Sequence, residues 1–163
     1  MIYLLLLKKK KTIDIIKCEY ILCTGLFEKY DQDLNYYKKI LKNEINKKMI
    51  CTNPDLVVDK GEKREYCAGS VAKIFEDLGG KVEYFGKPYS NVYSQSTKKI
   101  KKKKVLCIGD NLNTDIRGAN MQNFSSLPIS GGIHRNELLI KNQNDLFNEY
   151  DVNVDYVQKS LKW

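Results

Sequence analysis

A short apolar run that ends abruptly in an acidic residue constrains this chain more than any other feature of its sequence. Residues 105–108 are apolar, Gly109-Asp110 follows at once, and a second carboxylate, Asp115, comes shortly afterwards. A buried strand that brings one acid to its C-terminal tip, with another just beyond, suits a divalent cation site at the edge of a parallel sheet. Asp is also common where strands end and helices begin, so on spacing alone a capping turn is an equally good interpretation.

Other segments have the spacing of regular secondary structure. Apolar and aromatic residues recur at helical intervals in residues 31–48, and Asp31 is the expected N-cap of that helix. A polar loop that contains glycine predicts a hairpin between residues 56–58 and 65–67. The other strands expected from short apolar runs are residues 19–23, 49–52, 82–85, 126–129 and 155–157.

From Ser70 onward the expected helices and strands alternate along the chain. This order predicts an α/β fold with a parallel sheet and helices on its faces. In such folds the functional loops lie at the carboxyl ends of the strands. Three loops follow expected strands, at residues 86–88, 109–115 and 131–135, and we expect them to share one edge of the sheet.

Three features near these loops have both a functional and a structural interpretation. Lys87 can pair with phosphate or with carboxylates, although an exposed loop lysine is the simpler interpretation. His134, the single histidine, can contact substrate or transfer protons, but a structural hydrogen bond is the simpler interpretation. Asn53-Pro54-Asp55 is either a polar tip that contacts substrate or a turn, and its composition favours the turn.

The excess of positive charge does not by itself indicate a nucleic-acid partner. The formal charge is +8, from 28 basic and 20 acidic residues, and the lysine runs 8–11 and 98–104 supply much of it. These runs lack the interleaved aromatic residues on which bases stack, so a solvated surface is the simpler interpretation. Residues 1–7 are apolar but too few to cross a bilayer. We therefore expect neither a specific nucleic-acid partner nor a membrane.

Cysteine usage favours a reducing compartment. The number of cysteines is odd and no CxxC pair occurs, which argues against a disulfide framework and against a zinc site. A cytoplasmic location follows as the expectation. The five cysteines are Cys18, Cys23, Cys51, Cys67 and Cys107.

Several motifs occur in a fixed order along the chain, and together they carry a family resemblance. They are Cys51-Thr52-Asn53-Pro54-Asp55, Cys67-Ala68-Gly69-Ser70, Tyr84-Phe85-Gly86-Lys87-Pro88, Ile108-Gly109-Asp110 with Thr114-Asp115-Ile116-Arg117-Gly118-Ala119, and Gly131-Gly132-Ile133-His134-Arg135. From about residue 20 to the C-terminus, this order resembles the haloacid dehalogenase (HAD) superfamily, in its class IIA phosphatase-like branch. The resemblance implies a Rossmann-like core with an inserted α/β cap. Residues 1–66 would be the end of the cap, with 1–18 unassigned, and residues 67–163 the C-terminal half of the core.

The resemblance also implies an activity and roles for particular residues. The family reaction is Mg²⁺-dependent phosphoryl transfer from a small phosphorylated metabolite through an aspartyl-phosphate. Lys87 matches the lysine that stabilises the nucleophile and the phosphoryl group. Asp110 and Asp115 match the acidic pair that holds Mg²⁺ or orders its ligands. Asn53 and Asp55 match the end of the cap that faces the active site, and His134 is the third expected substrate contact.

One part of the family pattern does not match. The family begins with a strand that ends in a DxD motif, whose first Asp is the nucleophile. Here Asp31-Gln32-Asp33 spells DxD but precedes an expected helix instead of following a strand. We therefore expect the C-terminal half of such an enzyme, inactive alone, with an exposed apolar sheet edge. Its partner would be the N-terminal half or a second copy. The alternative is a non-catalytic module that binds phosphate or a partner chain.

Overall fold

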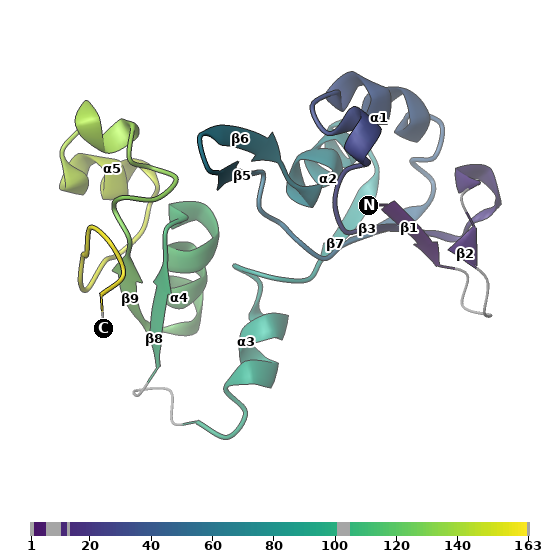
Figure 1. The fold of residues 1–163 in the computed structure, drawn as a ribbon. Coiled ribbons are helices and arrows are strands. Elements are labelled where there is room, and N and C mark those ends of the chain that lie inside the picture. Colours follow the sequence, from purple (N-terminus) through teal and green to yellow (C-terminus); the bar gives the residue numbers. More distant parts are fainter. Residues whose placement is uncertain (1, 6–10, 13, 101–104, 163) are drawn as a thin grey trace. The chain divides into compact units, whose positions relative to one another are not determined.

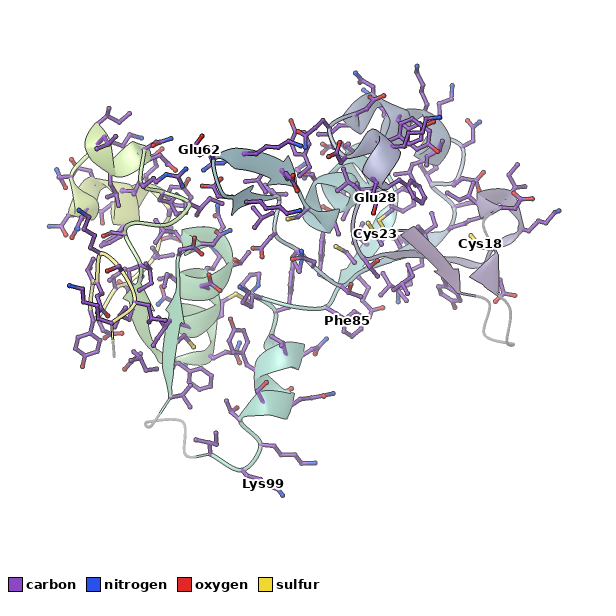
Figure 2. The ribbon with its side chains drawn as sticks, in the orientation of Figure 1. Cys18, Cys23, Glu28, Glu62, Phe85 and Lys99 are labelled. Atoms are coloured by element: carbon purple, nitrogen blue, oxygen red, sulfur yellow. The ribbon has the colours of Figure 1, made fainter. Side chains whose placement is uncertain are left out.

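The computed structural model describes residues 2–5, 11–12, 14–100 and 105–162. The chain forms two compact units, Met1–Gly86 and Lys87–Trp163. Figure 1 shows the elements of each unit along the colour gradient from purple to yellow. The predicted lysine runs lie largely outside the described residues, although Lys98 and Lys99 are described and exposed, and the Lys99 side chain is labelled in Figure 2.

The first unit is built on a five-stranded sheet in the order β2-β1-β3-β4-β7. Three of its strands are parallel, namely β3 (Tyr20–Cys23), β4 (Lys48–Cys51) and β7 (Lys81–Tyr84). They confirm the strands predicted from the apolar runs. The strands β1 (Ile2–Leu5) and β2 (Lys11–Thr12) extend the sheet antiparallel to β3 and to each other. Periodicity did not predict these two strands, because the four apolar residues of β1 fit several structures and β2 has only two residues.

Two helices lie on this sheet and bury its core. They are α1 (Leu34–Leu41) and α2 (Ala68–Asp77), and their inward residues Tyr37, Leu41 and Phe75 are fully buried. The predicted helix 31–48 is shorter than expected, because residues 42–47 turn back to deliver the parallel strand β4. The N-cap is Asp33 and not Asp31, since the Asp33 carboxylate accepts the Tyr36 N–H at 3.1 Å.

The predicted hairpin is present as a separate two-stranded sheet. Its strands are β5 (Val57–Lys60) and β6 (Lys63–Tyr66), paired antiparallel. Gly61 at the turn has φ of 65°, a left-handed conformation that glycine adopts readily. An ion pair between Arg64 and Asp59 crosses the two strands at 2.8 Å. Along the chain, α2 lies between this hairpin and β7, and it packs on the five-stranded sheet.

The second unit holds a two-stranded parallel sheet of β8 (Leu106–Gly109) and β9 (Ser125–Pro128). A π-helical turn (Leu112–Ile116) and α4 (Arg117–Gln122) connect the two strands. The helices α3 (Ser90–Ser96) and α5 (Gln143–Glu149) complete the unit, with a 3-10 turn at Glu137–Leu139. A small core forms around Leu112, Ile116 and Leu146.

The chain after α5 runs along the outer edge of β9. Tyr156 N–H donates to the Ser126 carbonyl, and Gln158 N–H donates to the Pro128 carbonyl. The predicted strand 155–157 is wrong, because only the isolated bridge between Ile129 and Gln158 forms there. The segment still hydrogen-bonds along β9, so that edge is covered.

The compact units and the predicted domains are divided at different residues. The first unit ends at Gly86 and the second begins at Lys87, while the boundary between cap and core at 66–67 stays a prediction. The reason is that α2 and β7 belong to the first unit, where β7 pairs with β4 and not with β8. The alternating helices and strands after Ser70 therefore form parallel strands in two sheets, with β7 in the first and with β8 and β9 in the second. The assignment of cap and core to these segments stays a prediction. No helix in the described part of the chain is long and apolar enough to cross a membrane.

Candidate active site at the tip of β8

The carboxyl end of β8 brings two acidic side chains together. Asp110 follows the last residue of β8 and is exposed, whereas Asp115 is buried in the π-helical turn that comes next. Asn111 N–H donates to Asp115 Oδ2 at 3.2 Å. A side chain at Gly109 would overlap the Asp115 carboxylate, so only glycine allows the turn to fold this closely over the strand. The N-cap of the turn is Asn111 and not Asp115, because the Asn111 side chain accepts the Asn113 N–H at 3.0 Å.

Lys87 reaches the same cluster from the start of the second unit. Its ammonium group donates to Asp115 Oδ1 in an ion pair whose carboxylate is 10% exposed and whose lysine is 45% exposed. A carboxylate that receives both a backbone N–H and a charged ammonium is held in one orientation. Asp115 therefore holds the Lys87 ammonium group at the end of β8. The predicted roles of Lys87, Asp110 and Asp115 stay predictions.

The loop after β9 closes the site from the neighbouring strand. Ile133 N–H donates to Asp110 Oδ2 at 3.1 Å. A side chain at Gly132 would overlap Asp110 at its Cβ, so the loop can lie this close only with glycine there. Since β8 and β9 are parallel, their following loops meet at one edge, as the rule for parallel sheets requires.

His134 is buried in this loop and both of its ring nitrogens are hydrogen-bonded. Leu112 N–H donates to Nε2 at 3.2 Å, and Nδ1 lies 2.7 Å from Glu137 Oε1. Because a backbone N–H can only donate, Nε2 must accept, and the ring proton is on Nδ1. The ring also packs edge-on to Tyr150, with centroids 4.7 Å apart. This environment favours the structural interpretation of His134.

Two ionisable neighbours of Asp115 are held neutral by their surroundings. Burial, with Cys107 and Asp115 nearby, raises the pKa of Tyr93 to about 12. Burial and the Asp115 charge also raise the pKa of the Cys107 thiol. Tyr93 packs its hydroxyl against Gly118, where a side chain would overlap it. Both groups are therefore neutral near pH 7, and neither adds a charge beside Asp115.

The Asn53-Pro54-Asp55 motif lies in the first unit. Asn53 Oδ1 accepts the Asp55 N–H at 3.4 Å, and the Asp55 carbonyl accepts the Gly69 N–H at 3.1 Å. Gly69 has no room for a side chain beside the carbonyls of this segment. These contacts are those of a turn packed on the start of α2, and the predicted contact of Asn53 and Asp55 with substrate stays a prediction.

The donor set at the tip of β8 fits one mode of Mg²⁺ binding. Mg²⁺ is usually held by one or two carboxylates together with waters and substrate phosphate. Asp110 is exposed and its Oδ2 has one backbone donor, which leaves its carboxylate accessible to a cation. Among the described residues no group of three or more His, Cys, Asp or Glu side chains could form an all-protein metal site. The residues thus suit a cation that also takes oxygens from substrate.

Sequence reasoning missed the residues that support His134. Glu137 and Tyr150 hydrogen-bond to each other at 3.0 Å, and Glu137 also contacts His134. The i,i+3 spacing of His134 and Glu137 is a signal that was available, because such pairs face each other in a helical turn. No pattern in the sequence near Tyr150 indicated that its hydroxyl would contact Glu137.

Known proteins that resemble this chain include members of the family that its motifs suggested. Residues 84–162 match the HAD-hydrolase-like family model. A haloacid dehalogenase-like hydrolase from Brucella suis 1330 is 30% identical over 75% of this chain and 51% of that chain, with a TM-score of 0.69. No curated protein matches the chain.

Two further solved structures share the fold at lower identity. A p-nitrophenyl phosphatase from Archaeoglobus fulgidus is 19% identical, with a TM-score of 0.65 over 91% of this chain and 56% of that one. A possible sugar phosphatase from Cytophaga hutchinsonii is 21% identical, with a TM-score of 0.69 over 91% and 55%. This chain therefore spans about half the length of the solved structures that it matches.

Proposed function

This chain belongs to the HAD-like hydrolase family, and from that premise we propose that it forms the charge-neutralising part of a Mg²⁺-dependent phosphatase site. The substrate class is a small phosphorylated metabolite. The observation that carries the proposal is the ion pair of Lys87 and Asp115 beside Asp110 at the tip of β8. The Lys87 ammonium group suits a dianionic phosphoryl group, and the accessible Asp110 carboxylate suits the metal that accompanies it. Asp115 holds the lysine in place.

Each of the three residues has a distinct proposed role. Asp110, which is exposed, is the direct Mg²⁺ ligand. Asp115 has its oxygens engaged by Lys87 and by Asn111 N–H, so it orients the lysine. Lys87 then contacts the phosphoryl oxygens and neutralises their charge. Bound Mg²⁺ would supply further neutralisation of the phosphoryl group.

The attacking carboxylate is proposed to come from outside the candidate residues named above. The DxD sequence of this chain is not at a strand tip, because Asp33 caps α1 and Asp31 follows a 3-10 turn. Asp31 also lies 3.5 Å from Lys63 in an exposed ion pair. Neither carboxylate is in the compact unit of Lys87. We therefore propose that these 163 residues alone hydrolyse phosphate esters negligibly.

A strand from another segment is proposed to pair with β8. Among the described residues β8 pairs with β9 alone, and Leu106 and Ile108 on it are 43% and 41% exposed. Parallel strands are normally covered on both faces. An apolar strand that ends in an acid would pair with the open edge of β8 and bring the missing carboxylate to the tip, while the chain segments that accompany it would cover the exposed face. A second copy of the chain is the alternative partner.

The activity test uses p-nitrophenyl phosphate as substrate. We expect the purified chain alone, with Mg²⁺, to hydrolyse no more of it than the variant Asp110→Asn. Adding the part of the Brucella suis hydrolase that this chain does not cover should restore Mg²⁺-dependent hydrolysis, and Asp110→Asn or Lys87→Ala should abolish it again. Robust hydrolysis by the unmixed chain, lost in Asp110→Asn, would contradict the proposed absence of a nucleophile.

A non-catalytic module is the second candidate, favoured by the position of the DxD sequence away from any strand tip. Hydrogen exchange at Leu106–Gly109 distinguishes the two. Slow exchange in the isolated chain indicates an autonomous module, whereas fast exchange indicates a strand that awaits its partner. A cytoplasmic location is also proposed, supported by five free cysteines of which four are buried.

A further inference from the structure

The loop after β9 does more than lie beside the acidic cluster, because it holds the backbone of the turn that carries Asp115. Two adjacent residues of this loop contact the turn at different points. Ile133 N–H donates to the Asp110 carboxylate, and His134 Nε2 accepts the Leu112 N–H. One contact therefore orients a carboxylate directly, and the other fixes the backbone that follows it.

The His134 contact is itself held in place by a buried network. Glu137 accepts from the ring proton on Nδ1 and from the Tyr150 hydroxyl. Burial alone would raise the pKa of Glu137, but the hydrogen bonds from His134 and Tyr150 lower it overall, so this residue is a carboxylate near neutral pH. Arg117 joins the same assembly, since its guanidinium donates to the Tyr150 carbonyl at 2.7 Å. The network thus ties the loop, α4 and the end of α5 together.

The direction of these hydrogen bonds decides what His134 can do. An imidazole that must accept from a backbone N–H through Nε2, and donate to a carboxylate through Nδ1, has no free nitrogen for substrate. It is also 7% exposed. A residue in this position can act only through the groups that it holds.

We infer that His134 is a positioning residue, which keeps the turn after Asp110 in the conformation that presents Asp110 to a divalent cation and holds Asp115 against Lys87. Glu137 and Tyr150 orient the imidazole for this purpose. The inference rests on the proposed function in one respect, because it assumes that Asp110 binds a cation. The part that concerns the conformation of the turn does not depend on it.

The test compares variants that separate the two hydrogen bonds of the imidazole. His134→Phe keeps a flat ring and removes both bonds. His134→Gln carries an amide oxygen that can reach Leu112 N–H, whereas His134→Asn is too short to reach it and can contact only Glu137. Glu149→Gln, which breaks the exposed ion pair with Lys141 in the same unit, is the matched control.

Amide hydrogen exchange gives the first measurement. The loss of one hydrogen bond should speed exchange at the Leu112 amide by about fivefold in His134→Phe and His134→Asn. His134→Gln should restore most of the protection, and Glu149→Gln should leave Leu112 unchanged. If His134→Phe does not fold, the contrast between the Gln and Asn variants gives the same answer. Equal exchange at Leu112 in the Gln and Asn variants would overturn the inference.

Binding of Mn²⁺ alone gives the second measurement, followed through paramagnetic broadening of the Asn111 amide. Mn²⁺ accepts the same oxygen ligands as Mg²⁺. We expect its affinity to fall about tenfold in His134→Phe, as for other residues that orient metal ligands, and to recover in His134→Gln. Unchanged affinity in His134→Phe would refute a role in presenting Asp110. Broadening that is the same in wild type and Asp110→Asn would instead refute the proposed metal ligand, and the Leu112 exchange would still decide the role of His134.

Discussion

The two compact units bury their strands to very different extents. In the first unit, residues on the inner face of the sheet, such as Ile21 on β3 and Met49 on β4, are fully buried. In the second unit, Leu106 and Ile108 on β8 are exposed, and the sheet has two strands. The unit that carries the candidate catalytic residues is therefore the one whose sheet is incompletely covered. The contacts of Asp110 and Asp115 thus form at the end of a strand that, among the described residues, pairs on one side only.

The largest expected effect comes from a matched pair of isoleucine substitutions. Ile21→Ala should lower the free energy of unfolding of the first unit by about 2–5 kcal/mol, because it leaves a cavity in a filled core. Ile108→Ala should cost less than about 1 kcal/mol, because its side chain is 41% exposed. Denaturant unfolding followed by residue-resolved hydrogen exchange measures both. Comparable losses would mean that β8 is covered in solution, for example by a second copy.

A smaller effect is expected when the close contact over β8 is disturbed. Gly109→Ala should destabilise the second unit by about 1–3 kcal/mol, because the new methyl group overlaps Asp115 and must displace it. Gly61→Ala in the hairpin of the first unit is the control, since it has open space and only its positive φ costs energy, about 1 kcal/mol. Hydrogen exchange should show faster opening at Asn111 for Gly109→Ala alone. If Gly109→Ala exchanges like wild type, the turn is looser than its contacts indicate.

High pH should weaken the second unit through Tyr93. Its pKa is raised to about 12 from an ordinary value of 10, so the folded state favours the neutral phenol. The associated stability is present below pH 10 and is lost as the pH rises towards 12, by on the order of 1–2 kcal/mol for a partly exposed group. Comparing unfolding of wild type and Tyr93→Phe between pH 9 and about 11.5 isolates this contribution. If the free energy of unfolding falls equally with pH in the two proteins, the pKa of Tyr93 is not raised in the folded state.

The smallest effect is expected at low pH and involves Glu137. Its pKa lies below the ordinary value of 4.5. Its contribution to stability is therefore present above pH 4.5 and is lost as the pH falls below that value, by less than about 1 kcal/mol because the side chain is partly exposed. Unfolding of wild type and Glu137→Gln from pH 6 to about pH 3 checks this. A Glu137→Gln curve with the same acid slope as wild type would show that the carboxylate gains nothing from His134 and Tyr150.

Sequence patterns predicted most elements correctly where the pattern is local. The strand before Asp110 and the hairpin around Gly61 both occur close to the predicted residues. Boundaries were less accurate, as Asp33 and not Asp31 caps α1. The two aspartates are separated by one residue and are chemically identical caps, so the choice between them depends on where the preceding 3-10 turn ends.

The sequence names the residues of the candidate site, whose roles stay predictions, but it does not predict the contacts that those residues make. Lys87, Asp110 and Asp115 were expected near one another from their positions after strands. That expectation assumed one sheet, yet β7 and β8 lie in different sheets. The lysine is close to the carboxylates because it starts the second unit, one residue after the first unit ends.

The sequence by itself determined the local elements, the strand that ends in Gly109-Asp110 and the order of motifs that marks the family. Those properties depend on residues a few positions apart, where hydrophobic periodicity and turn chemistry act directly. The tertiary structure alone decided which strand pairs with which, that Lys87 is held by Asp115, and that His134 accepts from Leu112. Such contacts join residues more than twenty positions apart, and packing selects them from many partners of the same chemical type.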